Sequence, residues 1–444
     1  MSEEWSGVED AIEDPEEIGV IFCALDSFSQ YGKNAHMNCT HFRRQAFYTL
    51  PQAHWQMLAA PPFNYLDTLN RVDMAIESNA KLARAIVKVG LHTFGMVDAD
   101  SEPVIPGEWS GLAKHNDIDK ARSTIRQFYR DWSAEGRVER DACYGPVLSA
   151  LEAEKTRKQG QTTWADTTMV AAQAPLHVLV PGAGLGRLVF ELCRQGYETE
   201  GNEISYHQLL GSSYILNSCE RVDRHTIYPW IHSFSNHRSR ANQFASYSIP
   251  DVHPQQALIE TTAAGGKIGS MKMCAADFLC LYGDDAHAGA YDAVATVFFL
   301  DTAPNLIRYL QVIWHCLCPG GVLVNVGPLL WHWENHVPGH HGYDGDNDDN
   351  DENTSLGIAD PGNFELTDEE VMALVERIGF VVETRESGIR APYVQDSQSM
   401  LQTVYSASYW VARKPAADEM DAKHGTAAEA VGSNLSDAGG IKKT

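Results

Sequence analysis

Short apolar runs alternate with amphipathic segments of helical spacing between residues 176 and 328. Strands that alternate with helices in this way form a parallel sheet, because each crossover helix returns the chain to the same edge. The runs that fit strands in this region are 177–180, 197–202, 272–274, 293–299 and 322–326. Two later runs, 380–384 and 408–412, would complete a seven-strand sheet. The alternation therefore predicts an α/β chain with a Rossmann-like sheet.

A glycine-rich turn follows the first of these runs. Residues 178–187 read VLVPGAGLGR, which places Gly182, Gly184 and Gly186 between a buried strand and an amphipathic helix. Without side chains there, a ligand can approach the backbone closely, and the first turn of the helix offers N–H groups. Glu203 ends the next run, where a carboxylate can accept hydrogen bonds from both hydroxyls of a ribose. Dinucleotide-binding folds share this arrangement, and tight strand-to-helix packing alone also explains the turn, so these residues do not identify the ligand.

Two further features favour S-adenosylmethionine as the cofactor. Asp277 and Phe278 follow the third run, where a carboxylate can accept an adenine amino proton and an aromatic ring can cover the purine face. Residues 318–321 read CPGG and connect a helix predicted over 305–317 to the fifth run. A helix, a Pro-Gly-Gly turn and a strand at this point resemble class I methyltransferases. Val297, near the end of the fourth run, is assigned to the same cofactor site.

Composition shifts divide the chain. Apolar residues recur at helical spacing ahead of the sheet, and both ends are rich in acidic and small residues that cannot offset the entropy of ordering. The predicted parts are a disordered tail (1–16), an N-terminal helical region (17–120), a methyltransferase domain (121–415) and a second disordered tail (416–444). Within the domain, residues 226–269 lack periodicity and are predicted to be an inserted loop over one edge of the sheet, and 340–355 form an acidic insertion.

Charge and cysteine usage exclude several classes of function. A formal net charge of -25 argues against nucleic acid or anionic lipid as a partner, because both require clustered cations. No apolar run approaches the roughly 18 residues that a membrane span needs. Nine cysteines without a Cys-x-x-Cys pair, and an acidic N-terminus, predict reduced thiols in the cytoplasm or nucleus. We expect no metal site, because the acidic run 344–352 has no glycine at the position that a calcium loop requires, and His336, His340 and His341 have no cysteine at ligand spacing.

Longer motifs resemble the carnosine N-methyltransferase family. They are LVPGAGLGR (179–187), GNE (201–203), YPWIH (228–232), PDV (250–252), FFLDTA (298–303) and NVGPLLWH (325–332). The likeness runs from about His41 to Pro415, and the acidic insertion departs from it without interrupting a motif. The resemblance implies methyl transfer from S-adenosylmethionine to the imidazole of carnosine (β-alanyl-histidine), a small-molecule dipeptide, to give anserine.

The resemblance also assigns residues to the cofactor. A Gln-Phe-x-Arg segment that closes over the methyl donor in this family corresponds to residues 127–130. Gln127 and Arg130 would then bind the cofactor, and the Arg130 guanidinium suits a carboxylate held by two parallel hydrogen bonds. The alternative interpretation is a solvated helix face.

By the same resemblance, the substrate residues correspond to Asp301, His332, Tyr393 and Tyr405. Asp301 and His332, which are also the expected catalytic residues, follow the fourth and fifth runs, at the carboxyl edge where open α/β sheets bind ligands. Asp301 could instead cap the following helix, His332 could be a structural histidine, and the tyrosines could be core aromatics.

The chemistry requires little from the protein beyond position. A neutral imidazole, with a pKa of about 6.5, is already nucleophilic at neutral pH. Its attacking nitrogen must be bare, so the other nitrogen carries the proton, and Asp301 or His332 would accept it. Three alternatives stay open: a different acceptor (a histidine in a peptide or protein, or another imidazole metabolite), a dinucleotide-dependent oxidoreductase, and a non-catalytic binding module. The oligomeric state is also open, with a homodimer as one option.

Overall fold

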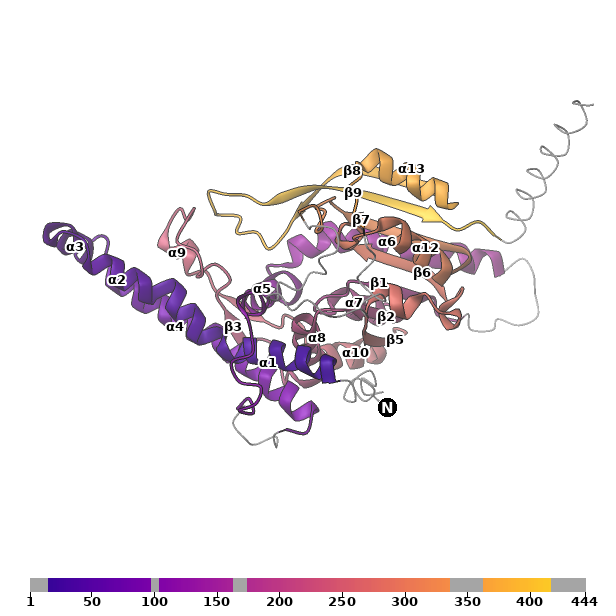
Figure 1. The fold of residues 1–444 in the computed structure, drawn as a ribbon. Helices are drawn as coiled ribbons and strands as arrows, with labels where there is room; N and C mark the ends of the chain where they lie inside the picture. Colours follow the sequence, from indigo (N-terminus) through magenta and orange to yellow (C-terminus); the bar gives the residue numbers. More distant parts are fainter. Residues whose placement is uncertain (1–14, 97–103, 163–173, 336–361, 417–444) are drawn as a thin grey trace, which may run out of the picture. The chain divides into compact units, whose positions relative to one another are not determined.

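The computed structural model describes residues 15–96, 104–162, 174–335 and 362–416 (Figure 1). The acidic insertion at 340–355 and nearly all of both predicted tails lie outside the described residues. The chain folds as two compact units. Unit 1 lies within 1–148, 180–276 and 388–407, and unit 2 lies within 149–179, 277–387 and 408–444.

The N-terminal region is helical, as predicted. Its elements are α1 (Pro15–His36), η3 (Met37–His41), α2 (Phe42–Tyr48), α3 (Gln52–Ala59) and α4 (Tyr65–Thr93). Helix α5 (His115–Trp132) spans the predicted boundary at residue 120, and α6 (Arg137–Thr162) follows it ahead of the sheet. Helix α4 buries Leu69, Val72, Ile76, Leu82 and Ile86, the stripe that its helical spacing requires. This face packs against α1 in the core of unit 1. Figure 1 shows α2, α3 and the first turns of α4 extending away from that core as an arm.

An ionic cluster holds the base of this arm. His36 at the end of α1 contacts Asp73 through Nδ1 at 2.7 Å and Glu77 through Nε2 at 2.8 Å, and both carboxylates belong to α4. Asp73 also accepts hydrogen bonds from Arg44 of α2 and Thr40 of η3. Because both ring nitrogens of His36 face carboxylates, the protonated imidazolium satisfies this arrangement best.

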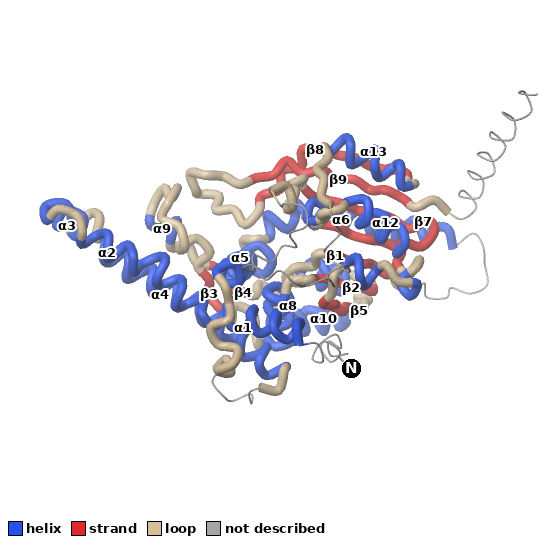
Figure 2. The backbone as a smooth tube through the Cα atoms, in the orientation of Figure 1, coloured by secondary structure: helices blue, strands red, loops and turns tan. Residues whose placement is uncertain are grey.

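Seven strands form one sheet, and each of the seven predicted runs overlaps a strand. They are β1 (His177–Pro181), β2 (Glu198–Glu203), β5 (Ser270–Ala275), β6 (Tyr291–Val297), β7 (Leu317–Gly327), β8 (Val381–Pro392) and β9 (Val404–Arg413). The order is β5-β2-β1-β6-β7-β9-β8. Figure 2 draws the strands in red. β1 pairs with β6, β2 with β5 and β6 with β7 in parallel, whereas β7 and β9 are antiparallel. The predicted Rossmann-like, seven-strand class I methyltransferase fold is confirmed.

Helices and short turns connect the strands. They are α7 (Arg187–Arg194), α8 (Tyr206–Ser213), η4 (Tyr214–Ser218), α11 (Phe278–Tyr282), η5 (Asp285–His287), η6 (Leu300–Thr302), α12 (Leu306–Cys316) and α13 (Asp368–Ile378). Helix α12 buries Leu306, Leu310 and Ile313, spaced for one helical face, in the core of unit 2. The helix predicted over 305–317 is therefore observed almost residue for residue.

The prediction of an inserted loop over 226–269 was wrong in its secondary structure. The segment contains most of β3 (His225–Ile227) and all of α9 (Arg240–Gln243), β4 (Tyr247–Ile249) and α10 (Pro254–Ala263). β3 and β4 form a separate antiparallel pair. Strands this short show less than two periods of alternation, so the sequence pattern could not reveal them.

Candidate functional site

The glycine-rich turn begins where β1 ends. Gly182, Gly184 and Gly186 have φ values of 67°, 57° and 74°, in the left-handed region that glycine adopts without steric cost. Helix α7 starts immediately afterwards at Arg187. The three glycines are therefore required by the backbone conformation of the turn, which folds the chain back towards the tip of β2.

The Glu203 carboxylate faces this turn. Its Oε2 accepts the N–H of Gly184 at 2.8 Å, and its Oε1 accepts the N–H groups of Ile204 at 3.0 Å and Ser205 at 2.9 Å. Burial raises the pKa of Glu203, while the three N–H donors oppose that rise. A carboxylate has about four acceptor positions, so roughly one is left, on Oε2. Glu203 lies where it was predicted, at the tip of β2. It can accept about one direct hydrogen bond from a ribose instead of the two that were expected.

Helix α5 places Gln127 beside the turn. A Cβ atom at Gly184 would lie 3.3 Å from Gln127 Nε2, so the space above this glycine is bounded by the Gln127 amide. Gln127 Nε2 donates to Asp131 at 3.2 Å, and Gln127 Oε1 accepts from Gln208 of α8 at 2.9 Å. At the end of α5, Trp132 Nε1 donates to the carbonyl of Leu185 at 3.0 Å. Gln127 is thus part of the turn's surroundings and not of a solvated helix face.

Gln208 was missed by the sequence analysis. Its Oε1 is buried, has no hydrogen-bond partner among the described residues, and would lie 4.0 Å from a Cβ atom at Gly184. A buried carbonyl oxygen without a donor is costly, so a ligand that donates a hydrogen bond here would gain affinity. A glutamine in the helix after β2 belongs to no sequence motif. Only the packing of α8 against α5 shows that Gln208 lies beside the turn.

Arg130, also on α5, is 5% exposed and therefore not part of a solvated face either. Its guanidinium carbon lies 4.9 Å from the ring centroid of Tyr393 and 5.5 Å from that of Tyr144. The rings of Tyr393 and Tyr405 meet edge to face, with centroids 6.4 Å apart. Unit 1 therefore brings together a residue predicted to bind the cofactor and two predicted to bind the substrate.

A buried ionic network behind the turn was also missed. Asp251 accepts hydrogen bonds from Arg187 Nη1 at 2.6 Å and Arg140 Nη2 at 2.8 Å. Its own N–H donates to the carbonyl of Trp132 at 2.8 Å. Arg187 belongs to the glycine-rich motif and Asp251 to the PDV motif, so both were visible in the sequence. Their pairing joins residues 64 positions apart and could not be read from either motif.

Asp301 and His332 lie next to each other in unit 2. Asp301, in η6, is 3% exposed, its Oδ2 accepts the N–H of Leu330 at 2.9 Å, and its carbonyl accepts the N–H of His332 at 3.1 Å. Burial raises the pKa of Asp301, and the N–H of Leu330 and the nearby His332 oppose that rise. Asp301 does not cap α12, because Asn305 fills that position by accepting the N–H of Arg308 at 3.3 Å. The His332 residue is exposed.

The residues predicted to contact adenine lie at the start of α11. Asp277 caps α11, with Oδ1 accepting the N–H groups of Leu279 at 2.9 Å and Cys280 at 3.0 Å. Phe278 is 4% exposed, and its ring packs in the core of unit 2 against other rings, those of Tyr282, Phe299 and Tyr309. Core packing therefore covers most of the Phe278 ring, and its contact with a purine face stays a prediction. Val297 is half-buried at the end of β6.

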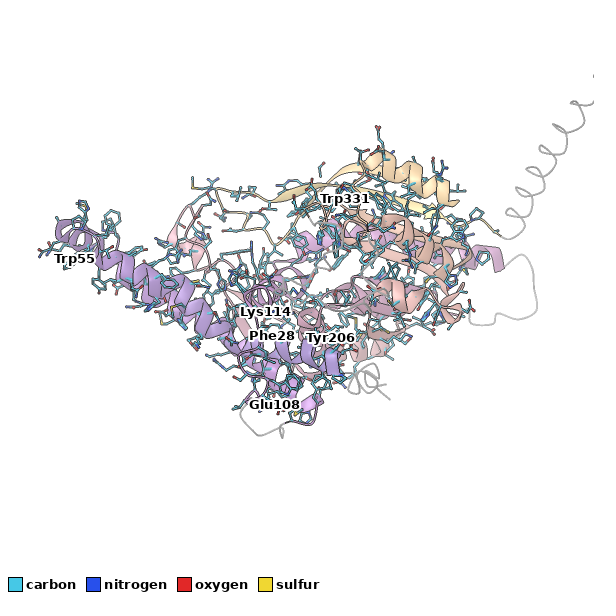
Figure 3. The ribbon with its side chains drawn as sticks, in the orientation of Figure 1. Phe28, Trp55, Glu108, Lys114, Tyr206 and Trp331 are labelled. Carbon is cyan, nitrogen blue, oxygen red and sulfur yellow. The ribbon has the colours of Figure 1, made fainter. Side chains whose placement is uncertain are left out.

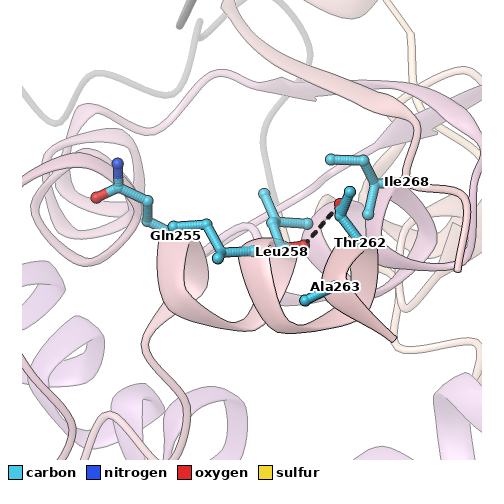
Figure 4. A pocket seen from close by; sticks show the side chains of 6 residues that line it. Gln255, Leu258, Thr262, Ala263 and Ile268 are labelled. Carbon is cyan, nitrogen blue, oxygen red and sulfur yellow. Dashed lines mark hydrogen bonds between the residues drawn. The ribbon is translucent and has the colours of Figure 1, made fainter. Parts of the chain in front are cut away.

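A groove of about 460 Å³ lies along α10, lined by Gln255, Leu258, Ile259, Thr262, Ala263 and Ile268 (Figure 4). None of the predicted site residues lines this groove. Among the described residues, no group of three His, Cys, Asp or Glu side chains could hold a metal ion. In the same parts of the chain, no helix has the length and apolarity that a bilayer crossing requires.

Comparisons with known proteins give a consistent match. A family model described as carnosine N-methyltransferase matches residues 108–416. Carnosine N-methyltransferase from Rattus norvegicus is 32% identical over 394 residues, covering 88% of this chain and 85% of the relative. The enzyme of that name from Schizosaccharomyces pombe is 33% identical over 407 residues, covering 90% of this chain and 97% of the relative.

Solved structures give weaker matches. A SAM-dependent methyltransferase from Methanosarcina mazei is 13% identical with a TM-score of 0.32, covering 55% of this chain and 94% of that one. An arsenic(III) S-adenosylmethionine methyltransferase from Chlamydomonas reinhardtii is 14% identical with a TM-score of 0.29, covering 55% of this chain and 65% of that one. At these scores the superpositions support no conclusion about function.

Proposed function

Because the chain belongs to the carnosine N-methyltransferase family, we propose that it methylates the imidazole of carnosine to give anserine. Membership makes the chain an S-adenosylmethionine-dependent N-methyltransferase, which excludes the oxidoreductase alternative. The observation that carries the proposal is the Glu203 carboxylate turned onto the left-handed glycine turn, with Gly184 donating to it at 2.8 Å. The acceptor is inferred from the names of the relatives.

The residues around the turn fit the methyl donor. A side chain at Gly184 would fill the space beside Gln127, so the cradle exists only because a glycine stands there. Glu203 Oε2 would accept a hydrogen bond from a ribose hydroxyl of S-adenosylmethionine. The buried Gln208 Oε1 would accept a second hydrogen bond from the same cofactor. Arg130 would hold the carboxylate of the methionine part. When bound, S-adenosylmethionine supplies an electrophilic methyl group on a sulfonium.

Asp301 and His332 would orient the imidazole of carnosine. The attacking nitrogen needs its lone pair, so the proton stays on the other ring nitrogen and requires an acceptor. The Asp301 carboxylate is fixed by the N–H of Leu330 and retains further acceptor positions. In its ionised form it would accept the ring N–H and stabilise the positive charge that develops on the imidazole. His332 lies beside Asp301, because its N–H donates to the Asp301 carbonyl at 3.1 Å.

The direct test is incubation of the purified chain with S-adenosylmethionine and carnosine. Mass spectrometry should detect a product heavier by one methyl group, and NMR should identify the methylated nitrogen. Histidine-containing peptides and free histidine serve as competing acceptors. Methylation of a peptide in preference to carnosine would replace the proposed acceptor, and donor binding without transfer to any imidazole would favour a binding module.

A homodimer is proposed as the assembly, on the evidence of the arm. Tyr48, Met57 and Met74 lie on α2, α3 and α4, and each is more than 60% exposed. Figure 3 shows Trp55 of α3 at the outer end of the arm. Exposed apolar side chains on three successive helices are typical of an interaction surface, and a second copy of the chain is the occupant that we propose. Sedimentation should give twice the chain mass, and Tyr48→Asp with Met57→Asp should give the monomer, whereas Val138→Asp, equally exposed on α6, should not.

A further inference from the structure

A buried carboxylate ties the loop that carries Tyr393 to helix α6. Glu139, in the first turn of α6, is 3% exposed. Its Oε2 accepts the N–H of Val394 and its Oε1 accepts the N–H of Gln395, both at 2.7 Å. Two consecutive backbone donors on one carboxylate form a short, charge-assisted restraint. The restrained residues begin the loop 393–403, which connects β8 to β9.

The backbone held by Glu139 is strained. Val394 has φ of 46°, a left-handed conformation that a β-branched residue adopts only when its surroundings enforce it. Besides Glu139, Arg126 enforces it by donating from Nη2 to the Val394 carbonyl at 2.9 Å. Gln395 then fixes the far end of the loop, because its Oε1 accepts the N–H of Thr403. Glu139 therefore holds the point at which the chain departs from its preferred conformation.

That point controls Tyr393. The Tyr393 ring packs 4.9 Å from the Arg130 guanidinium and meets the Tyr405 ring. Since Val394 follows Tyr393 directly, a change of the Val394 backbone to an ordinary φ would redirect the Tyr393 side chain. We propose that Glu139 is a positioning residue for substrate binding, acting through Val394 and Gln395 to hold Tyr393 against Arg130. This inference rests on the proposed function and on the predicted assignment of Tyr393 to the substrate.

Glutamine cannot replace Glu139 in this role. Its amide oxygen can accept one of the two N–H groups, but its NH₂ group then faces the other donor, which is left without an acceptor. Glu139→Gln keeps the volume and the packing of the buried side chain, so it perturbs the restraint without opening a cavity. A suitable control is Glu154→Gln, a buried glutamate on the same helix that is paired with Arg157 and Arg413 instead of the loop.

The experiment compares wild type, Glu139→Gln and Glu154→Gln by hydrogen–deuterium exchange and by steady-state kinetics. In Glu139→Gln we expect faster exchange confined to residues 393–403, and a rise of about tenfold in KM for carnosine, as the loss of one charge-assisted hydrogen bond predicts. The KM for S-adenosylmethionine should rise much less than the KM for carnosine, because Arg130 keeps its contact with the Tyr144 ring when Tyr393 moves. Glu154→Gln should leave both the loop exchange and the KM for carnosine unchanged.

The two readouts separate the inference from the proposed function. Unchanged loop exchange in Glu139→Gln would overturn the restraint, and faster exchange with an unchanged KM for carnosine would overturn the positioning role. Equal KM effects in both variants would also overturn it, because they would indicate general destabilisation. If the wild-type chain methylates no imidazole dipeptide, the proposed function fails, and the exchange comparison alone then decides whether Glu139 restrains the loop.

Discussion

Replacement of Glu203 by glutamine should weaken donor binding more than it slows methyl transfer. The Glu203 carboxylate accepts three backbone N–H groups, one from Gly184 on Oε2 and two on Oε1, and about one acceptor position remains. The glutamine oxygen can replace only one of the two carboxylate oxygens. The NH₂ group then confronts either the Gly184 N–H or the pair from Ile204 and Ser205.

The size of the effect follows from these bonds. A hydrogen bond to a charged group contributes roughly 1.5 to 3 kcal/mol, so loss of the bond to a ribose hydroxyl should raise the Kd for S-adenosylmethionine roughly 10- to 100-fold. If the Gly184 N–H also lost its acceptor, the turn would be less well held and the affinity for S-adenosylmethionine would fall further. Isothermal titration calorimetry with S-adenosylmethionine measures the Kd, and kcat at saturating donor measures the transfer step.

Glu200→Gln is the matched control. Glu200 is buried on the same strand and pairs with Lys272 at 2.8 Å and Cys274 at 3.2 Å. Residues three apart on a strand point to opposite faces, so this variant should lose stability without losing donor affinity. The reasoning about Glu203 would be refuted if Glu203→Gln bound the donor within threefold of wild type while its kcat fell.

Three further outcomes are expected. Asp301→Asn should lower kcat by about 100-fold or more, since the ring N–H would lose its charged acceptor, while calorimetry finds the donor Kd within twofold of wild type. Asp251→Asn should lower the free energy of unfolding in urea by about 3 kcal/mol, because Arg140 and Arg187 would be left buried without their shared carboxylate. Burial alone would lower the pKa of His36, but hydrogen bonds with its two carboxylate partners outweigh it and raise that pKa above 6.5. The stability that His36 contributes is therefore complete below pH 6.5 and lost as the pH rises through the folded-state pKa.

Controls accompany each of these outcomes. If Asp301→Asn lost affinity for S-adenosylmethionine, Asp301 would be assigned to the cofactor site instead of the carnosine site. For Asp251, the exposed pair of Arg137 and Asp141 offers Asp141→Asn, which should cost no more than about 0.5 kcal/mol. For His36, urea unfolding at pH 6.0 and pH 8.5 should show a larger loss of stability in wild type than in His36→Gln. Equal losses in the two proteins would contradict the assignment.

The sequence alone determined the sheet and the turn. Alternation of apolar runs with helical spacing is a local property, and all seven runs that it indicated overlap strands. The glycines at 182, 184 and 186 and the carboxylate at 203 could be predicted because the turn and the next strand tip are fixed by neighbours in the chain. Strands β3 and β4 escaped prediction because three residues are too few to show a periodic pattern.

Tertiary structure decided everything that depends on residues far apart in the chain. Phe278 could be assigned to a purine from its position after β5, yet core packing covers most of its ring. Glu139 accepts the N–H of Val394, a residue more than 250 positions away in the sequence, and no local sequence pattern predicts that contact. Periodicity records only which face of an element is apolar. The partner of a buried charge is chosen by three-dimensional packing, because its desolvation must be offset by whichever groups the fold brings within hydrogen-bonding distance.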